Sequence, residues 1–193
     1  MSDVTVVIDG RRITADEDTT ILEAATSAGI DIPTLCHHPD VTPYGGCRLC
    51  TVEIAKGGRS RLVASCAYQV EDGLEVQTES APVVEGRRLI LELLLARAPG
   101  VRELRDYGRR YGVDVAGLKR DVNLCILCGL CVNYCAEVKG KHAVCFIGRG
   151  VDREVLFLPD AKEECAECGE CASLCPTGVF PSISGVARVP HFS

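Results

Sequence analysis

The first eighty residues alternate between apolar and polar positions in short runs that predict a small β-rich domain. The stretch DVTVVIDGRRITAD places two β-branched runs on either side of Asp9-Gly10, a strong hairpin signal. In TTILEAATSAG, Thr20 and Glu23 have the spacing of a capping box, and Gly29 can end the helix. Further strands are expected at CTVEIA, at RLVASC after the turn Lys56-Gly57-Gly58, and at 74–78. The chain therefore opens with the order β-β-α and then returns to strands.

Two helices are expected after this domain. The first begins at Pro82, runs to about Arg97 and ends at Pro99-Gly100. It is apolar on most sides, so we expect it to be buried between two modules. The second covers about 101–111 and stops at Gly112. Its apolar face would consist of Val101, Leu104, Tyr107 and Tyr111.

The composition changes this picture through its 13 cysteines among 193 residues. The N-terminus lacks a basic segment followed by an apolar stretch, so we expect no secretory signal. No window approaches the roughly 18 uninterrupted apolar residues that a membrane span needs. An odd number of cysteines also fits a closed disulfide framework poorly. We expect a cytoplasmic protein whose thiols stay reduced or bind metal.

The net charge of −6 argues against nucleic acid as the main partner, because a phosphate-binding surface needs a net basic face. One segment has the opposite charge. It could be a solvated helix face or a docking patch for an acidic partner subunit. Its basic residues are Arg102, Arg105, Arg109, Arg110, Lys119 and Arg120.

Two similar runs of four cysteines form the only internal repeat that we find, beginning at Cys125 and at Cys165. Each has the spacing Cys-x2-Cys-x2-Cys-x3-Cys of bacterial ferredoxins with [4Fe–4S] clusters, and Pro176 follows the second. A tight loop turns three successive thiolates toward one centre. The three-residue step starts a helix and directs the fourth thiolate away, so in two-cluster proteins that cysteine ligates the other cluster.

The sequence therefore predicts two cubane clusters with crossed ligands. The first is held by Cys125, Cys128, Cys131 and Cys175, and the second by Cys135, Cys165, Cys168 and Cys171. Zinc is the weaker alternative, because zinc ligands usually come as two separated pairs. Disulfides would need an oxidising compartment. Ala136 replaces the Pro that often follows such a run, which affects backbone stiffness and not ligation.

An earlier group has looser spacing, with the ligands of a [2Fe–2S] cluster predicted as Cys36, Cys47, Cys50 and Cys66. Its first gap is longer than the four residues of plant-type sites. Gly45 and Gly46 would let backbone N–H groups approach the sulfurs. The β-β-α opening also suits a β-grasp ferredoxin.

The histidines beside this group raise the alternative of a Rieske centre, in which two His replace two Cys. That pattern needs a His two residues beyond another Cys, and none is present. We therefore expect His37 and His38 to lie near the cluster or on the surface. Cys145 is left over, and we expect it to be a small buried residue of a strand. His142 and His191 receive no role.

The three cysteine groups together resemble a known family. CILCGLCVNYCAEVKG and CGECASLCPTGVF look like the cubane region of the large iron–sulfur subunit of respiratory complex I. They look equally like the diaphorase iron–sulfur subunit of NAD-reducing [NiFe] hydrogenases. PTLCHHPDVTPYGGCRLCTVEI looks like the [2Fe–2S] module of both. Similar modules occur in [FeFe] hydrogenases and some formate dehydrogenases.

The chain departs from this family in one respect. The family usually has a His-x3-Cys-x2-Cys-x5-Cys cluster after the long helix, whereas LLLARAPGVRELRDYGRRYGVD contains neither His nor Cys. We therefore expect three clusters in an α+β chain. Its parts would be a β-grasp [2Fe–2S] domain over 1–80, a cluster-free helical linker over 81–120 and a ferredoxin-like 2[4Fe–4S] domain over 121–193.

The chain shows neither a glycine-rich phosphate loop nor a GxGxxG after a strand, so we expect it to bind neither NAD nor flavin and to be non-catalytic. The resemblance implies an electron-transfer subunit of an NAD(P)-linked oxidoreductase. It would relay single electrons between an NAD(P)H-oxidising flavoprotein subunit and a catalytic subunit, such as a hydrogenase or formate dehydrogenase. The alternatives are a diffusible ferredoxin-type carrier and a zinc-binding scaffold.

Overall fold

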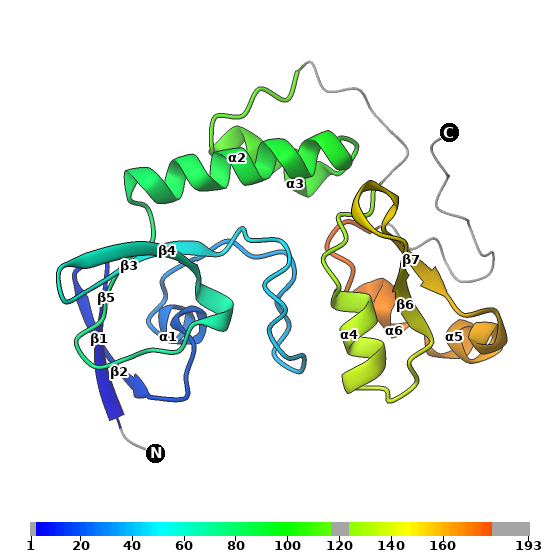
Figure 1. The fold of residues 1–193 in the computed structure, drawn as a ribbon, viewed down its shortest axis with the longest axis horizontal. Coiled ribbons are helices and arrows are strands. Elements are labelled where there is room, and N and C mark those ends of the chain that lie inside the picture. The colour runs from blue at the N-terminus through cyan, green and yellow to red at the C-terminus, as the bar shows by residue number, and fades with distance from the viewer. Residues whose placement is uncertain (1–2, 117–123, 179–193) are drawn as a thin grey trace. The chain divides into compact units, whose positions relative to one another are not determined.

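The predicted hairpin forms as β1 (Asp3–Ile8) and β2 (Arg11–Asp16), which pair antiparallel. The computed structural model describes residues 3–116 and 124–178 (Figure 1). Asp9 and Gly10 both have positive φ, 49° and 78°. A two-residue turn of this kind matches the twist of paired strands, which explains why Asp-Gly marks the site.

The hairpin belongs to a five-stranded mixed sheet in the order β2-β1-β5-β3-β4. β1 runs parallel to β5, while β3 is antiparallel to both β4 and β5. Helix α1 lies against this sheet (Figure 1). The fold is α+β, and its N-terminal part is a β-grasp domain. The remaining bounds are α1 (Ile21–Ser27), β3 (Thr51–Lys56), β4 (Arg59–Ala64) and β5 (Glu75–Gln77).

The capping box at the start of α1 is confirmed. Thr20 Oγ1 accepts the backbone N–H of Glu23 at 3.2 Å, and the Glu23 carboxylate accepts the backbone N–H of Thr20 at 2.8 Å. Gly29, with φ of 72°, follows the helix end. The apolar face of α1 and the inward side chains of the strands form one aliphatic core.

The chain divides into two units, the first made of residues 1–35 and 47–91 and the second of 36–46 and 92–193. Helix α2 (Ala81–Arg97) continues from one into the other. Its buried side includes Leu91 and Leu95, but Leu89 and Leu93 are 56% and 64% exposed. We expect this helix to be buried between two modules, but part of its apolar surface, at Leu89 and Leu93, is exposed. The apolar residues of α2 extend around more of the helix surface than the neighbouring elements cover.

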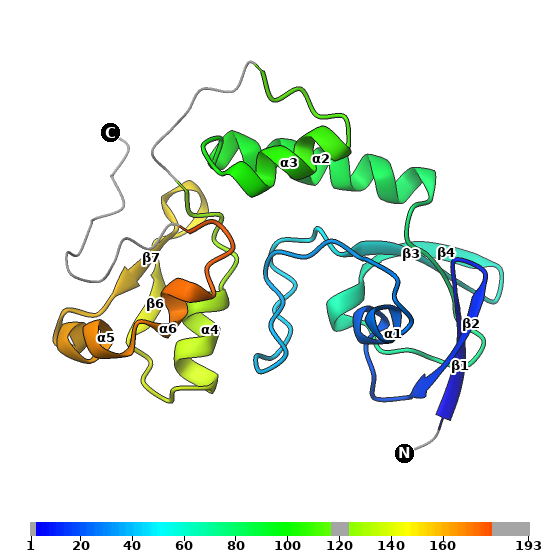
Figure 2. The same ribbon diagram turned by 180° about the vertical axis from the view of Figure 1, so that it is seen from behind.

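Helix α3 (Arg102–Arg110) folds back beside the end of α2 in both views (Figures 1 and 2). Within the predicted apolar face, Leu104 is buried, and Tyr111, which directly follows the helix, is buried as well. A Cβ at Gly108 would lie 2.9 Å from the Leu95 side chain, so the small residue permits the close approach of the two helices. Among the described residues, no helix is both long and apolar enough to cross a membrane.

The cysteine-rich part of the second unit is built from short elements around a two-stranded antiparallel sheet. Helix α4 packs against β6, and α4 also contacts α6. The helices are α4 (Leu130–Glu137), α5 (Lys162–Cys168) and α6 (Glu170–Ser173), and the strands are β6 (Val144–Ile147) and β7 (Glu154–Phe157). Short 3₁₀ turns cover Ser65–Ala67 in the first unit and Gly150–Asp152 and Pro159–Ala161 in the second.

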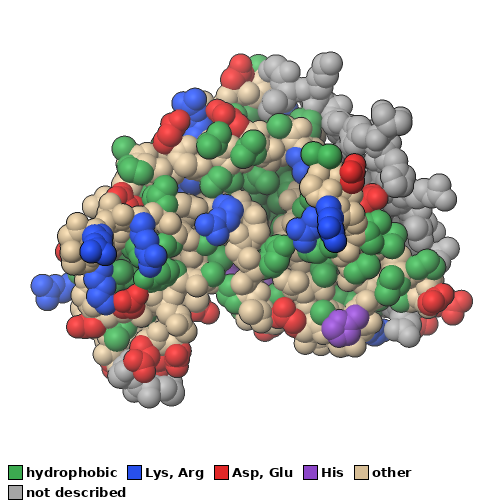
Figure 3. Space-filling view, in the orientation of Figure 1, with side chains coloured by type: hydrophobic (Ala, Val, Ile, Leu, Met, Phe, Trp, Pro, Cys, Tyr) green, Lys and Arg blue, Asp and Glu red, His purple; other side chains and the backbone are tan. Residues whose placement is uncertain are grey.

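The basic segment predicted as a helix face or docking patch is engaged locally in its described part. Arg105 donates hydrogen bonds to the carbonyls of Pro99 and Val115, and Arg109 pairs with Asp106 at 2.5 Å. Lys119 and Arg120 lie outside the described residues. On the face drawn in Figure 3, basic and acidic side chains are interspersed. These contacts favour the solvated helix face over the docking patch.

Candidate metal centres

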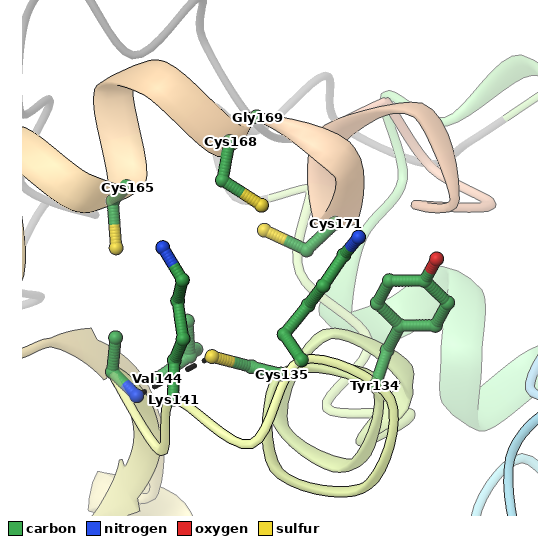
Figure 4. A pocket seen from close by; sticks show the side chains of 10 residues that line it. Tyr134, Cys135, Lys141, Val144, Cys165, Cys168, Gly169 and Cys171 are labelled. Atoms are coloured by element: carbon green, nitrogen blue, oxygen red, sulfur yellow. Dashed lines mark hydrogen bonds between the residues drawn. The ribbon is translucent and has the colours of Figure 1, made fainter.

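A pocket in the second unit is lined by four cysteines that come from both runs. Cys135 lies on α4, Cys165 and Cys168 on α5, and Cys171 on α6. Their sulfur atoms face a common space (Figure 4). The backbone N–H of Ala143 donates a hydrogen bond to Cys135 Sγ at 3.3 Å. The structure therefore brings together the four residues predicted as ligands of the second cubane.

The thiols of this pocket disfavour one another's ionisation. Burial raises the pKa of Cys171, and the nearby thiols of Cys135, Cys165 and Cys168 raise it further, to about 11. Four thiolates can share such a space only if a cation compensates their charge. The donor set, four sulfurs without a carboxylate among the lining residues, fits an iron–sulfur cluster.

The first three cysteines of the earlier run lie with the last cysteine of the later run. Burial raises the pKa of Cys131, and the thiols of Cys128, Cys171, Cys125 and Cys175 raise it further. Burial also raises the pKa of Cys125, and Cys175 contributes to that rise. Because such effects weaken with distance, they support the expected place of Cys175 close to the first run, and its assignment as a ligand there stays a prediction. Cys131 and Cys171 are also neighbours, so the two cysteine sets adjoin.

The two runs differ in local structure. Residues 124–129 precede α4 as a loop, whereas Cys165 and Cys168 lie on a helix, α5. The expectation of a tight loop is therefore met only in the first run. The segment KEECAEC contains mostly good helix formers, which explains the difference.

Two of the Cys-x2-Cys turns contain a non-glycine residue in the left-handed conformation. Arg48 has a φ of 61° within 47–50, and Leu127 has a φ of 55° within 125–128. This conformation costs roughly 1–2 kcal/mol for a residue with a Cβ. Left-handed residues in turns help to gather backbone N–H groups around an anion, which suits a cluster held by thiolates.

In the first unit, Cys50 and Cys66 lie together, with their Sγ atoms 3.4 Å apart. The pairing of β3 with β4 aligns the segments that carry them, and the Ser65 N–H donates to the Cys50 carbonyl at 3.1 Å. The hydrogen bond with Cys66 lowers the pKa of Cys50 to about 6, against the effect of burial. The lowered pKa favours the thiolate of Cys50, the form that binds iron.

The other two predicted ligands of this group are buried as well. Cys47 is 4% exposed and Cys36 is 6% exposed. Cys36 opens the segment 36–46, which groups with the second unit. Their assignment as cluster ligands stays a prediction.

The long gap after Cys36 packs on the cysteine-rich region. The Tyr44 ring stacks on Phe146 with ring centres 6.4 Å apart, and the Thr42 N–H donates to the Glu137 carboxylate at 2.7 Å. A Cβ at Gly46 would lie 2.7 Å from the Tyr44 ring. Gly46 thus has a steric reason to be glycine that the sequence did not indicate.

Polar side chains join α4 to α6 beside the four-cysteine pocket. Glu170 pairs with Lys139 and accepts a hydrogen bond from the Tyr134 hydroxyl at 2.8 Å. The His38 ring meets Tyr134 edge-on at 5.5 Å, and its Nδ1 accepts the Asp40 N–H at 3.2 Å. His38 therefore has packing contacts in the second unit.

Two arginines of α2 contact predicted ligand loops, although no motif in the sequence marked either of them. Arg87 donates to the carbonyls of Leu49 and Thr51, and Arg97 donates to the carbonyl of Cys125. The only available signal was their presence in a helix rich in apolar residues, which they share with Glu85, Arg88 and Glu92.

Cys145 lies in β6, as expected for a strand, but it is half-buried rather than buried.

Within residues 3–116 and 124–178, no three His, Cys, Asp or Glu side chains are placed to bind one metal ion.

Comparison with known proteins identifies similar chains. Residues 2–81 match the family model described as "2Fe-2S iron-sulfur cluster binding domain". The NADPH-Fe(3+) oxidoreductase subunit alpha of Geobacter sulfurreducens is 35% identical over 93% of this chain and 24% of its own length. The NADP-reducing hydrogenase subunit HndD of Solidesulfovibrio fructosivorans is 34% identical over 93% of this chain and 36% of its own length. The chain thus spans only about a quarter to a third of these relatives.

This chain matches a larger share of one solved structure than of those relatives. The crystal structure of an NAD+-reducing [NiFe]-hydrogenase in the H2-reduced state contains a chain with a TM-score of 0.68 and 34% identity. The match covers 80% of the present chain and 74% of the hydrogenase chain. The NADH-ubiquinone oxidoreductase 75 kDa subunit of Reclinomonas americana is 30% identical over 93% of this chain and 29% of its own length.

Proposed function

The chain belongs to the iron–sulfur family that includes the matching chain of NAD+-reducing [NiFe]-hydrogenase and a region of the NADH-ubiquinone oxidoreductase 75 kDa subunit, and from this premise we propose that it is an electron-transfer subunit. It relays single electrons between an NAD(P)H-oxidising flavoprotein subunit and a catalytic subunit. Hydrogenase, formate dehydrogenase or a similar reductase would suit the second role.

The observation that carries this proposal is the convergence of the two cysteine runs. We infer that each run contributes three cysteines to one group and its fourth to the other, and the pocket that Cys135 lines with Cys165, Cys168 and Cys171 supports this for the second group. We assign the first [4Fe–4S] cluster to Cys125, Cys128, Cys131 and Cys175. We assign the second to Cys135, Cys165, Cys168 and Cys171, and a [2Fe–2S] cluster to Cys36, Cys47, Cys50 and Cys66.

Bound clusters of these types supply one-electron transfer at low potential. The chain's own residues hold the sulfur donors in place and limit the access of water. Cys131 and Cys135 are buried, and the Ala143 N–H donates to the Cys135 sulfur. The neighbourhood of Cys131 and Cys171 provides a short route between the two cysteine sets. Such residues transfer no atoms, so the chain needs no substrate pocket of its own.

Metal and sulfide analysis of anaerobically purified protein tests the assignment. We expect about ten iron atoms and about ten labile sulfides per chain. Brown protein with an absorbance band in the visible range is expected, whereas a zinc protein would be colourless. Stoichiometric zinc with little iron would overturn the proposal.

Native purification tests the partners. We expect a tagged chain, expressed in its own host at natural levels, to co-purify with a flavin-containing subunit. The complex should reduce an artificial acceptor with NADH or NADPH. A lone peak near 20.7 kDa in size-exclusion chromatography, with full cluster content, would favour the diffusible carrier instead.

A further inference from the structure

Arg87 is a fully buried cation beside the predicted [2Fe–2S] ligand loop. Its side chain has 0% exposure. Nε donates to the Leu49 carbonyl at 3.1 Å, and Nη2 donates to the Thr51 carbonyl at 2.9 Å. These are the residues directly before and after Cys50. The guanidinium therefore fixes the backbone on both sides of one ligand.

Arg97 binds the backbone of a ligand loop of the proposed first cubane, as Arg87 does at the [2Fe–2S] site. It is half-buried, ten residues farther along the same helix. Its Nε donates to the carbonyl of Cys125 at 2.9 Å, and Nη2 donates to the Arg153 carbonyl at 3.4 Å. Cys125 is itself a proposed ligand. Two arginines of α2 thus each bond to the backbone of a different cysteine loop.

Burying a guanidinium costs free energy that an apolar residue at the same position would not. At both positions the positive charge is held against backbone carbonyls near thiolate donors. A cluster ligated by four thiolates carries net negative charge, and reduction adds one more electron. A fixed cation beside the cluster therefore stabilises the reduced form more than the oxidised form, and most strongly where water is excluded, as at Arg87.

We propose that Arg87 and Arg97 are positioning residues that raise the reduction potential of one cluster each: Arg87 that of the [2Fe–2S] cluster and Arg97 that of the first cubane. This inference rests on the ligand sets of the proposed function. It assigns α2 the task of setting two potentials separately, through the charge of each arginine and the ligand loop that the arginine holds.

Glu79 gives the proposal a test of opposite sign. Its carboxylate accepts a hydrogen bond from Arg87 Nη1 at 2.7 Å, and its side chain is 47% exposed. The negative charge offsets part of the arginine's effect. Glu79→Gln should therefore raise the [2Fe–2S] potential, whereas Arg87→Gln should lower it.

The experiment is an EPR-monitored redox titration of the full-length, cluster-loaded protein. Iron and sulfide content is measured first, so absent clusters would refute the proposed function before any potential is read. Arg87→Gln and Arg97→Gln remove the charge but keep a side-chain N–H for a carbonyl. We expect each to lower the potential of its own cluster and to leave the other two unchanged.

Arg88→Gln is the matched control, because Arg88 lies on the same helix and its side chain is 48% exposed. It should shift no potential. Arg87→Lys and Arg97→Lys keep the charge and should stay closer to the wild-type potentials than the Gln variants. If Arg87→Gln loses its cluster, Glu79→Gln still decides the sign at that site, and Arg97→Gln decides independently at the other.

Three results would overturn the inference. One is an unshifted potential in both loaded Gln variants. Another is an equal shift of all clusters in either variant, which would indicate a general loss of structure. The third is a downward shift in Glu79→Gln. The first cubane is identified in these spectra as the signal that Cys175→Ala removes.

Discussion

Cys50 and Cys171 show how differently the fold treats two thiols that are both proposed as ligands. A hydrogen bond with Cys66 lowers the pKa of Cys50 to about 6, while burial and three neighbouring thiols raise that of Cys171 to about 11. The surroundings of the first thiol favour its thiolate, whereas those of the second favour the protonated form, which loses its proton when metal binds. The difference arises from neighbours that are brought together only by folding.

The lowered pKa of Cys50 predicts a pH dependence for the iron-free first unit. Its folded pKa, about 6, lies below the unfolded value of about 8.5. The resulting stabilisation is complete above the unfolded pKa and is lost as the pH falls through the folded pKa. We expect the unit to be more stable at pH 8.5 than at pH 6, by roughly 1–3 kcal/mol.

Hydrogen exchange of the β3 amides, corrected for the intrinsic pH dependence of exchange, measures this difference. Cys50→Ser should remove most of the pH dependence, because serine does not ionise in this range. Equal dependence in the variant and the wild type would show that another group is responsible.

Crossed ligation predicts the phenotype of Cys175→Ala. This change should damage the cluster of the first run and spare the one nearer to it in sequence, with a loss of up to about four irons. Mössbauer and EPR spectra distinguish the two clusters. Cys145→Ala is the matched control and should keep all iron. Loss of the second cubane with an intact first one would contradict the crossed assignment.

At the scale of elements, the β6–β7 hairpin depends on one glycine. Gly148 has a φ of 68°, and a Cβ there would lie 2.2 Å from the Asp152 carbonyl oxygen. Two residues later, Gly150 has a φ of 57°. A Cβ added there would meet no heavy atom within 4 Å, its chain neighbours left out. The two positions therefore share a backbone conformation but differ in steric freedom.

This pair predicts unequal costs of adding a methyl group. Gly150→Ala should cost about 1 kcal/mol for its conformation alone. Gly148→Ala should cost roughly 2–4 kcal/mol, because the turn must also move. Iron release to a chelator, followed over time at a fixed temperature, should be faster only in Gly148→Ala. Equal rates in the two variants would contradict the steric argument.

Elements whose signals are local could be predicted from the sequence. Asp9-Gly10 and the pair Thr20 and Glu23 specify their structures within a few residues, and the structure has both. The role of Arg87 could not be predicted, because its partners at Leu49 and Thr51 lie far away in sequence. The same holds for the packing of 36–46, which depends on contacts with α4 and β6.

For the whole molecule, the two units have very different cores. Within the described residues, the core of the first unit contains 15 buried residues from the sheet, α1 and the segments that connect them. The core beside α4 contains four, and two of these are the proposed ligands Cys131 and Cys135. A core of this size supplies little folding free energy, so the cysteine-rich region around α4 should depend on its metal.

Iron removal should therefore affect the two units unequally. After anaerobic treatment with a chelator, we expect amides of α4 and of β6–β7 to exchange at rates near those of an unfolded chain. Amides of β1, β3 and β5 should stay protected. Hydrogen exchange with mass spectrometry measures both in one sample. Retained protection at α4 would show that the polar contacts of Glu170 suffice without metal.

The exchange of fourth cysteines between the runs also limits how this protein can be rearranged. Under the proposed crossed ligation, Cys135 completes the centre of the later run and Cys175 that of the earlier one, so neither repeat is a self-sufficient module. Transplanting one repeat into another scaffold, or cutting the chain between them and losing one fragment, would leave each centre short of a donor. Engineering that aims at a single-cluster derivative should therefore retain both repeats and replace the donors of one centre.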